Sequence, residues 1–237
     1  MTSELTVLLG TAVTLGFVHT MVGPDHYLPF IAMARIGRWS TARTATITAL
    51  CGVGHVLSSV VLGFIGIAFG LAISKLTAFE SARGEIAAWL LITFGLTYCV
   101  WGLHRAIRGK SHEHVHIHEE EGLHTHTHSH VDSHAHVHSV PSAETMTPWI
   151  LFTIFVFGPC EVLIPLIMYT AAKHSMASVA LVAGVFGIST IATMLTTVLT
   201  THFGLARLSL GRLEKYSHAI GGLVIFLCGS AIKFLGL

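Results

Sequence analysis

Six long apolar stretches with few or no charges run through the 237-residue chain, whose mean hydropathy is +0.72. Each stretch offers roughly the 20 residues that a helix needs to cross a bilayer. The stretches are continuous, without the alternation over about ten residues that is typical of membrane strands. We therefore predict an all-α integral membrane protein with six transmembrane helices, over 5–34, 44–74, 86–103, 149–172, 175–206 and 216–232.

Two of these stretches are interrupted by a Gly-Pro pair followed by ionisable residues and a second proline. The first reads Gly23-Pro24-Asp25-His26-Tyr27-Leu28-Pro29, and the second reads Gly158-Pro159-Cys160-Glu161-Val162-Leu163-Ile164-Pro165. Proline removes a backbone donor and clashes with the preceding turn, so both helices should break near mid-membrane. Matched breaks in the two halves of a membrane protein indicate a substrate site.

The spacing of shared motifs indicates an internal duplication. The Gly-Pro pairs are 135 residues apart, and Phe69-Gly70-Leu71-Ala72 recurs as Phe203-Gly204-Leu205-Ala206 after 134 residues. A unit of three helices must be inverted in its second copy. We predict two inverted three-helix repeats with broken first and fourth helices, at 1–107 and 148–237, joined by a polar linker at 108–147.

The linker is exceptionally rich in histidine. Imidazole is a common ligand for zinc, nickel, cobalt and copper, and a tract of this composition cannot bury a core. We expect it to be disordered without metal and to act as an auxiliary metal-binding loop. Its eleven histidines are His112, His114, His116, His118, His124, His126, His128, His130, His134, His136 and His138.

Six residues at mid-membrane form the predicted metal site: His19, Asp25, His26, His55, Cys160 and Glu161. Ionisable groups at this depth are costly, and functional sites are where they usually occur. His19 and His26 are seven residues apart and share a helix face if the break is mild. We expect no lysine or arginine at mid-membrane, which favours a cation. Imidazoles, carboxylates and a thiol suit a borderline first-row divalent ion.

Two families resemble this chain. The segment from His19 to Asp25-His26, with Gly54-His55-Val56-Leu57-Ser58-Ser59, resembles the motifs of NicO-type nickel/cobalt transporters, and the histidine-rich loop resembles their efflux branch. Gly158-Pro159-Cys160 resembles the Pro-Cys motif of DsbD/CcdA-type thiol-electron carriers, which have a similar three-plus-three layout. Those carriers use a cysteine in each half, whereas Asp25 is the first-half counterpart of Cys160 here.

We predict a secondary transporter of divalent transition-metal ions that works by alternating access and is not an enzyme. The resemblance implies nickel or cobalt, with zinc as an alternative, as cargo rather than as a tightly bound cofactor. We expect the lipid bilayer and the metal ion as partners, and no nucleic acid. Whether the protein forms a homo-oligomer stays open. A thiol-redox membrane protein and a metal-delivery accessory factor are the alternatives. The direction of transport also stays open.

The basic residues predict the orientation in the plasma (inner) membrane. Nine of the 13 lysines and arginines fall on one side of a six-helix arrangement and four on the other. The positive-inside rule therefore places the linker in the cytoplasm and both termini outside.

An accessibility measurement tests this orientation. With Ser3→Cys and Ser139→Cys made separately, an impermeant thiol reagent applied to intact cells should label only the first. Permeabilised cells, in which both should react, are the control. Labelling of Ser139→Cys in intact cells would contradict the assignment.

Overall fold

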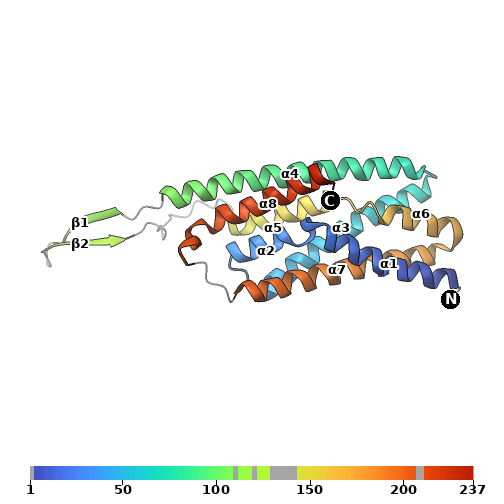
Figure 1. Ribbon diagram of the computed structural model, residues 1–237, viewed down its shortest axis with the longest axis horizontal. Helices are drawn as coiled ribbons and strands as arrows, with labels where there is room; N and C mark the ends of the chain where they lie inside the picture. Colours follow the sequence, from blue (N-terminus) through green and yellow to red (C-terminus); the bar gives the residue numbers. More distant parts are fainter. Residues whose placement is uncertain (1–2, 109–111, 119–121, 129–142, 207–210, 237) are drawn as a thin grey trace.

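The computed structural model describes residues 3–108, 112–118, 122–128, 143–206 and 211–236, and its apolar part is a bundle of α-helices (Figure 1). Five helices are long and apolar enough to cross a membrane, so the chain is a multi-pass membrane protein. The helices are α1 (Ser3–Val22), α2 (Leu28–Ile36), α3 (Thr41–Ala68), α4 (Ile73–Arg108), α5 (Ala143–Phe157), α6 (Leu163–Lys173), α7 (Met176–Ala206) and α8 (Ser217–Leu235).

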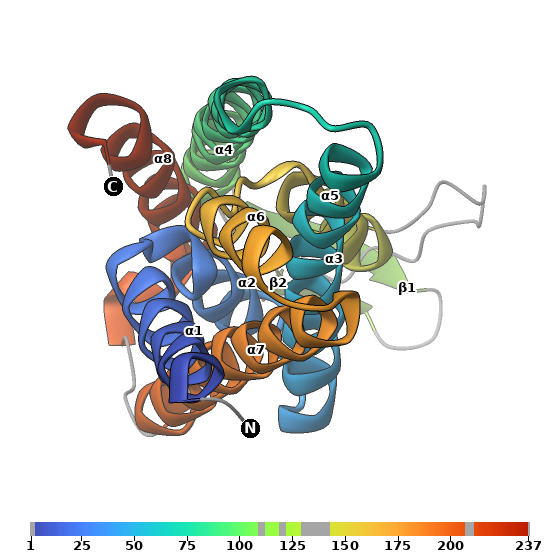
Figure 2. The ribbon, with the colours of Figure 1, turned by 90° about the vertical axis from the view of Figure 1, so that its right-hand side faces the viewer.

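Both Gly-Pro pairs interrupt helices, as predicted. Helix α1 ends at Val22, a short 3-10 turn η1 (Pro24–His26) follows, and α2 then begins at Leu28. Helix α5 ends at Phe157, and α6 begins at Leu163. In Figure 2, α6 lies inside the bundle, and it contacts α1, α3, α4 and α7. The second break therefore lies against the centre of the molecule rather than at its surface.

The predicted third span was wrong in extent. We expected a helix over 86–103 with Arg83 in the preceding loop, but α4 is continuous from Ile73 to Arg108 and carries Arg83 as a buried residue. Charged residues in the first part of α4 shorten the apolar stretch without ending the helix, because they pair with one another and with neighbouring segments. The inverted symmetry of the two halves remains a prediction.

Part of the histidine-rich linker is ordered as a hairpin, contrary to the expected disorder. Strands β1 (His112–His118) and β2 (Gly122–His128) pair antiparallel, with His112 opposite His128 and His116 opposite His124. Alternating residues with extended backbones pair readily in this way. His130, His134, His136 and His138 lie outside the described residues. The hairpin projects from the end of the bundle opposite the amino terminus (Figure 1).

Two apolar cores flank the middle of the bundle. The first, which we call the linker-side core, includes Phe30, Leu151 and Phe155; the second, the amino-side core, includes Val182 and Phe186. Phe155 of the linker-side core lies near His26 and His55, and Phe186 of the amino-side core lies near His19. The buried imidazoles therefore depend on protein groups for their hydrogen bonds.

Helix α4 packs along α8 at very short range. A Cβ atom on Gly95 would collide with the backbone of Phe226, and one on Gly222 would collide with the backbone of Cys99. Small residues at such crossings let helix backbones touch, which replaces the hydrophobic driving force that is missing between helices in lipid.

Gly222→Ala should therefore destabilise the bundle by about 1–3 kcal/mol, because backbone cannot move aside as a side chain can. The matched control is Gly184→Ala in α7, where an added Cβ has no neighbour within 4 Å. That change should leave stability equal or higher, since alanine is the better helix former. Thermal unfolding in detergent, followed by tryptophan fluorescence, measures both. Equal melting temperatures for the two variants would contradict this account of the packing.

Candidate metal centre between the two helix breaks

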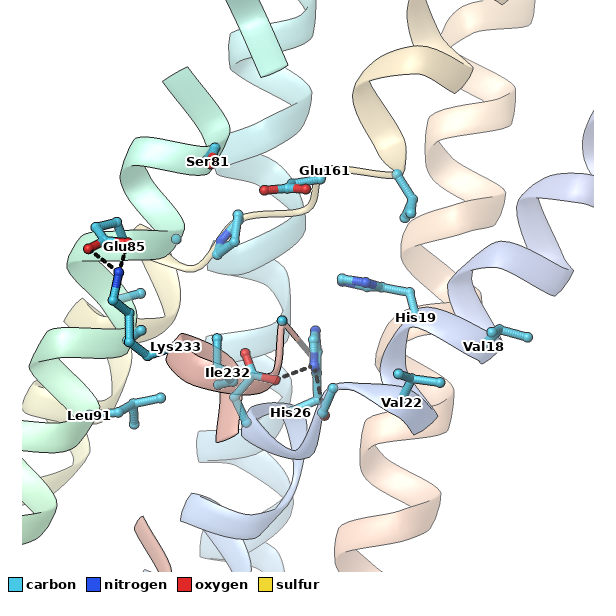
Figure 3. A pocket seen from close by; sticks show the side chains of 18 of the residues that line it. Val18, His19, Val22, His26, Ser81, Glu85, Leu91, Glu161, Ile232 and Lys233 are labelled. Atoms are coloured by element: carbon cyan, nitrogen blue, oxygen red, sulfur yellow. Dashed lines mark hydrogen bonds and ion pairs between the residues drawn. The ribbon is translucent and has the colours of Figure 1, made fainter. Parts of the chain in front are cut away.

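The first break folds His26 back towards α1. The Gly23 N–H donates to the carbonyl of His19 at 3.0 Å, and the His26 N–H donates to the carbonyl of Gly23 at 3.2 Å. This short 3-10 turn places His26 next to the end of α1. As a result the rings of His19 and His26 have centroids 4.6 Å apart (Figure 3).

Helix α3 supplies the third imidazole. His55 is 1% exposed and His26 is 2% exposed, and their Nε2 atoms are 3.4 Å apart. One nitrogen from each of His19, His26 and His55 lies within 4.8 Å of the others. The structure thus brings together three of the six predicted site residues in one cluster, from α1, η1 and α3.

The other ring nitrogens of the two buried histidines face oxygen acceptors. His26 Nδ1 lies 3.0 Å from Asp25 Oδ1 and 3.1 Å from the carbonyl oxygen of Gly23. His55 Nδ1 lies 3.4 Å from the carbonyl oxygen of Phe155. Neither a carbonyl nor a carboxylate can donate, so both Nδ1 atoms carry the proton. Hydrogen bonds of this kind fix the tautomer and orientation of histidines that bind metal.

The Nε2 atoms of the two buried histidines face each other at 3.4 Å. With protons on both Nδ1 atoms, one Nε2 can donate to the other only if one of the two rings carries a second proton. A metal ion between the two Nε2 atoms would take the place of that proton. For a tetrahedral ion with bonds of 2.0–2.1 Å to nitrogen, the nitrogen–nitrogen separation is about 3.3 Å. The spacing of the two imidazoles fits such an ion.

Cys160 from the second break meets the same cluster. Its side chain is fully buried, and its Sγ lies 3.7 Å from Nε2 of His19. Tetrahedral coordination by a nitrogen at about 2.05 Å and a sulfur at about 2.3 Å separates those two atoms by about 3.6 Å. The two ligand pairs therefore both have tetrahedral spacing, one in the first half and one across the halves.

The two predicted carboxylates occupy different places. Asp25 contacts His26, and its side chain is 20% exposed. Glu161 is exposed on the wall of a cavity of about 510 Å³, which Asp25, His19 and His26 also line. Figure 3 shows Glu161 on the connection between α5 and α6, outside the group of imidazoles. Across the cavity, Lys233 Nζ donates to Glu85 Oε2 at 2.6 Å.

Sequence reasoning missed two charged residues beside the second break, Glu80 and Arg83. Arg83 Nη1 donates to Glu80 Oε1 at 2.6 Å, and Glu80 is fully buried. The expectation of no arginine at the depth of the breaks was therefore wrong. The four-residue neighbourhood Glu80–Arg83 has the i, i+3 spacing of a helical ion pair, which was the only available signal.

Comparison with known families identifies the scaffold. Residues 29–231 match the family described as the cytochrome c biogenesis protein transmembrane region. The chain belongs to this family. No curated protein and no solved structure matches it.

The family match supports one of the two resemblances drawn from the sequence. It agrees with the similarity to DsbD/CcdA-type membrane proteins, and it does not show membership of the nickel/cobalt transporters. It therefore favours the thiol-redox alternative over metal transport. The geometry of the three imidazoles points separately to a cation site.

Asp25→Asn tests the role of the hydrogen bond to His26. An amide can present its NH₂ group to Nδ1 and so favour the other tautomer, which places the proton on the nitrogen that faces His55. Loss of such a hydrogen-bond partner typically costs 10- to 100-fold in metal affinity. We expect a cobalt(II) dissociation constant raised by that factor, measured by calorimetry in protein lacking residues 112–138. Glu214→Gln, which removes an exposed carboxylate beside Arg38, is the control and should bind normally. Unchanged affinity in Asp25→Asn would contradict the assigned tautomer.

Proposed function

We propose that this protein is a secondary transporter of divalent transition-metal ions rather than an enzyme. The observation that carries the proposal is the convergence of three imidazoles at the helix breaks, with one nitrogen of each within 4.8 Å of the others. The Nε2 atoms of buried His26 and His55 face each other at 3.4 Å. A bound cation would use both nitrogens as ligands.

The donor set indicates the class of ion. Three imidazoles and a thiol are borderline-to-soft ligands, which suit nickel, cobalt or zinc, whereas magnesium and calcium take oxygen ligands. Asp25 beside the cluster supplies negative charge close to the ion, and Glu161 and Glu85 add carboxylates along the cavity. We propose nickel or cobalt as the main cargo, with zinc as an alternative.

The broken helices support a transport mechanism. The ligands come from both halves of the chain, since His19, His26 and His55 lie in the first and Cys160 in the second. Rocking one half against the other would take the ligands apart on one side and expose the ion there, which is alternating access. The cavity beside His19 and His26 is the proposed path on one side of the site.

The basic residues support the proposed orientation. Arg35 lies at the end of α2, Arg43 at the start of α3, and Arg105 and Arg108 at the end of α4, while Arg38 lies between α2 and α3. These helix ends face the linker end of the bundle, away from the amino terminus (Figure 1). With that end in the cytoplasm, the histidine-rich linker would collect or buffer ions on the cytoplasmic side.

The family match carries a second candidate function, a thiol-redox membrane protein. Cys160 follows Pro159 in the break and is the cysteine that contacts the site among the described residues. All four cysteines of the chain are free thiols in this structure. As a redox protein, the chain would exchange the Cys160 thiolate with a disulfide of a partner protein: the Cys160 sulfur bonds to one partner sulfur, and the other partner sulfur leaves as a thiolate. Such exchange runs through a mixed disulfide.

Transport of cobalt into proteoliposomes tests the main proposal. His26→Ala should lower the initial rate at least tenfold, because a divalent ion then loses both a ligand and the imidazole that links it to Asp25. His104→Ala is the matched control: it removes an exposed histidine on α4 and should leave the rate unchanged. Both changes are made in protein lacking residues 112–138, so that the linker does not hide the effect.

Cys160→Ser separates the two candidate functions. For a transporter, this change weakens binding but leaves measurable flux through the three imidazoles. For a thiol-redox protein, it abolishes formation of a mixed disulfide with a partner, and His26→Ala leaves that reaction intact. Normal cobalt flux in His26→Ala, together with loss of thiol exchange in Cys160→Ser, would overturn the metal proposal in favour of the second candidate.

A further inference from the structure

An ion pair lies buried at the depth of the second helix break. The side chains of Glu80 and Arg83 are 0% and 10% exposed, and they are joined at 2.6 Å. Placing two charges in an apolar bundle costs several kcal/mol per ion unless further hydrogen bonds satisfy them. Among the described residues, their further hydrogen-bond partners lie on α3, at the end of α5 or in the second break, so the pair is built around that break.

Glu80 and Arg83 satisfy backbone groups that the break leaves open. Arg83 Nη2 donates to the carbonyl of Val156 at 2.6 Å and to that of Gly158 at 3.3 Å. Glu80 Oε2 accepts the N–H of Cys160 at 3.0 Å. The last carbonyls of a helix and the first amides of the next have no partner within their own helices. One ion pair thus binds the end of α5 and the backbone of Cys160 together.

The same arginine is tied to the helix that carries His55. Arg83 Nη2 donates to Ser58 Oγ at 2.7 Å, and Arg83 Nη1 lies 3.5 Å from Ser59 Oγ. These serines follow His55 by about one helical turn. Arg83 and Glu80 therefore link α3 to the backbone of Cys160 through a chain of hydrogen bonds.

Helix α4 also contacts the break directly. A Cβ atom on Gly84 would come within 2.7 Å of Pro159 Cγ, so the absence of a side chain there lets α4 lie against the proline. The peptide between Gly158 and Cys160 is consequently held on one side by apolar contact and on the other by charge-assisted hydrogen bonds, which are shorter and stronger than neutral ones.

We propose that Glu80 and Arg83 are positioning residues that set the sulfur of Cys160 as the fourth ligand of the metal site. This inference rests on the proposed metal function and adds what determines its ligand set. With the pair in place, the site has three nitrogens and one sulfur; without it, the Cys160 backbone moves and three nitrogens remain. Sulfur coordination replaces the thiol proton by the metal ion and releases that proton to the buffer. The pair therefore tunes the site towards ions that accept thiolate.

Cobalt(II) bound to the full-length chain in detergent provides the test, because a thiolate ligand adds a near-ultraviolet charge-transfer band that imidazole does not. The histidine-rich linker contains no cysteine and is silent in this band. In Glu80→Gln, one of the two oxygens that accept from Arg83 and from the Cys160 N–H becomes an NH₂ group, so one of these two donors faces another donor. We expect the band to fall at least fivefold, while the visible bands of cobalt held by nitrogen remain above those of His26→Ala.

Four further variants are compared with Glu80→Gln. Glu80→Asp keeps both carboxylate oxygens and should restore part of the charge-transfer band. Arg83→Lys keeps the positive charge but has one nitrogen in place of the two Nη groups, and it should reduce the band. Glu214→Gln, which removes an exposed partner of Arg38, should leave it unchanged. Cys160→Ser lacks the thiol and gives the absorbance without a thiolate ligand.

The outcomes separate this inference from the function on which it rests. A full-strength band in folded Glu80→Gln and Arg83→Lys would overturn the positioning role, and so would wild-type protein that binds cobalt at the imidazoles without any thiolate band. Wild-type protein whose cobalt spectrum equals that of His26→Ala would overturn the metal function itself, and the inference with it.

Discussion

Hydrocarbon imposes the constraint on which this structure depends: each backbone N–H and C=O at membrane depth needs a partner within the protein. Two helix breaks expose several such groups, at a cost on the order of several kcal/mol for each one left open. At the second break, His55, Arg83 and Glu80 provide the partners, through the carbonyls of Phe155, Val156 and Gly158 and the N–H of Cys160. The side chains that repair the backbone therefore also shape the candidate site.

This coupling explains the direction of the imidazoles. A histidine that donates from Nδ1 to an oxygen acceptor has only Nε2 left to offer, and its ring is fixed by that bond. His26 is held in this way by Asp25 and Gly23, and His55 by Phe155. The hydrogen bonds to the carbonyls of Gly23 and Phe155 therefore do two things: they satisfy backbone groups at the breaks, and they hold the imidazoles in place. A rearrangement of either break would change the ligand geometry directly, which is what an alternating-access mechanism requires.

Local chemistry made part of this structure predictable. Glycine and proline break helices wherever they occur together, so the ends of α1 and α5 followed from the sequence. The types of residue beside the breaks indicated the metal-binding candidates, of which His19, His26 and His55 cluster and Cys160 contacts them. Glu161 shares the motif but faces the cavity, since adjacent residues in an irregular segment point in different directions.

Long-range pairing was the part that the sequence could not show. Glu80, Arg83 and Glu85 look like the charged edge of a loop because they lie next to a shorter apolar stretch. In the folded chain, two of them are buried by contacts with residues more than 70 positions away in the second half. The hairpin of the linker was missed because only Val115, Ile117 and Leu123 alternate with the histidines as apolar residues, which is a weak strand signal.

The family match favours a thiol-redox function, whereas the three imidazoles favour a metal site, and Cys160 belongs to both interpretations. Membership in a family of cytochrome c biogenesis transmembrane regions establishes a scaffold, while function depends on the groups that the scaffold presents. A thiol relay needs two sulfurs within bonding reach, and among the described residues the polar side chain that contacts Cys160 Sγ is the imidazole of His19, at 3.7 Å. In the proposed metal site this thiol would be a ligand, because one metal ion can bond to both the sulfur and the imidazole nitrogens. The same Pro-Cys break can therefore support electron transfer in one site and metal coordination in another, depending on which side chains the opposite half provides.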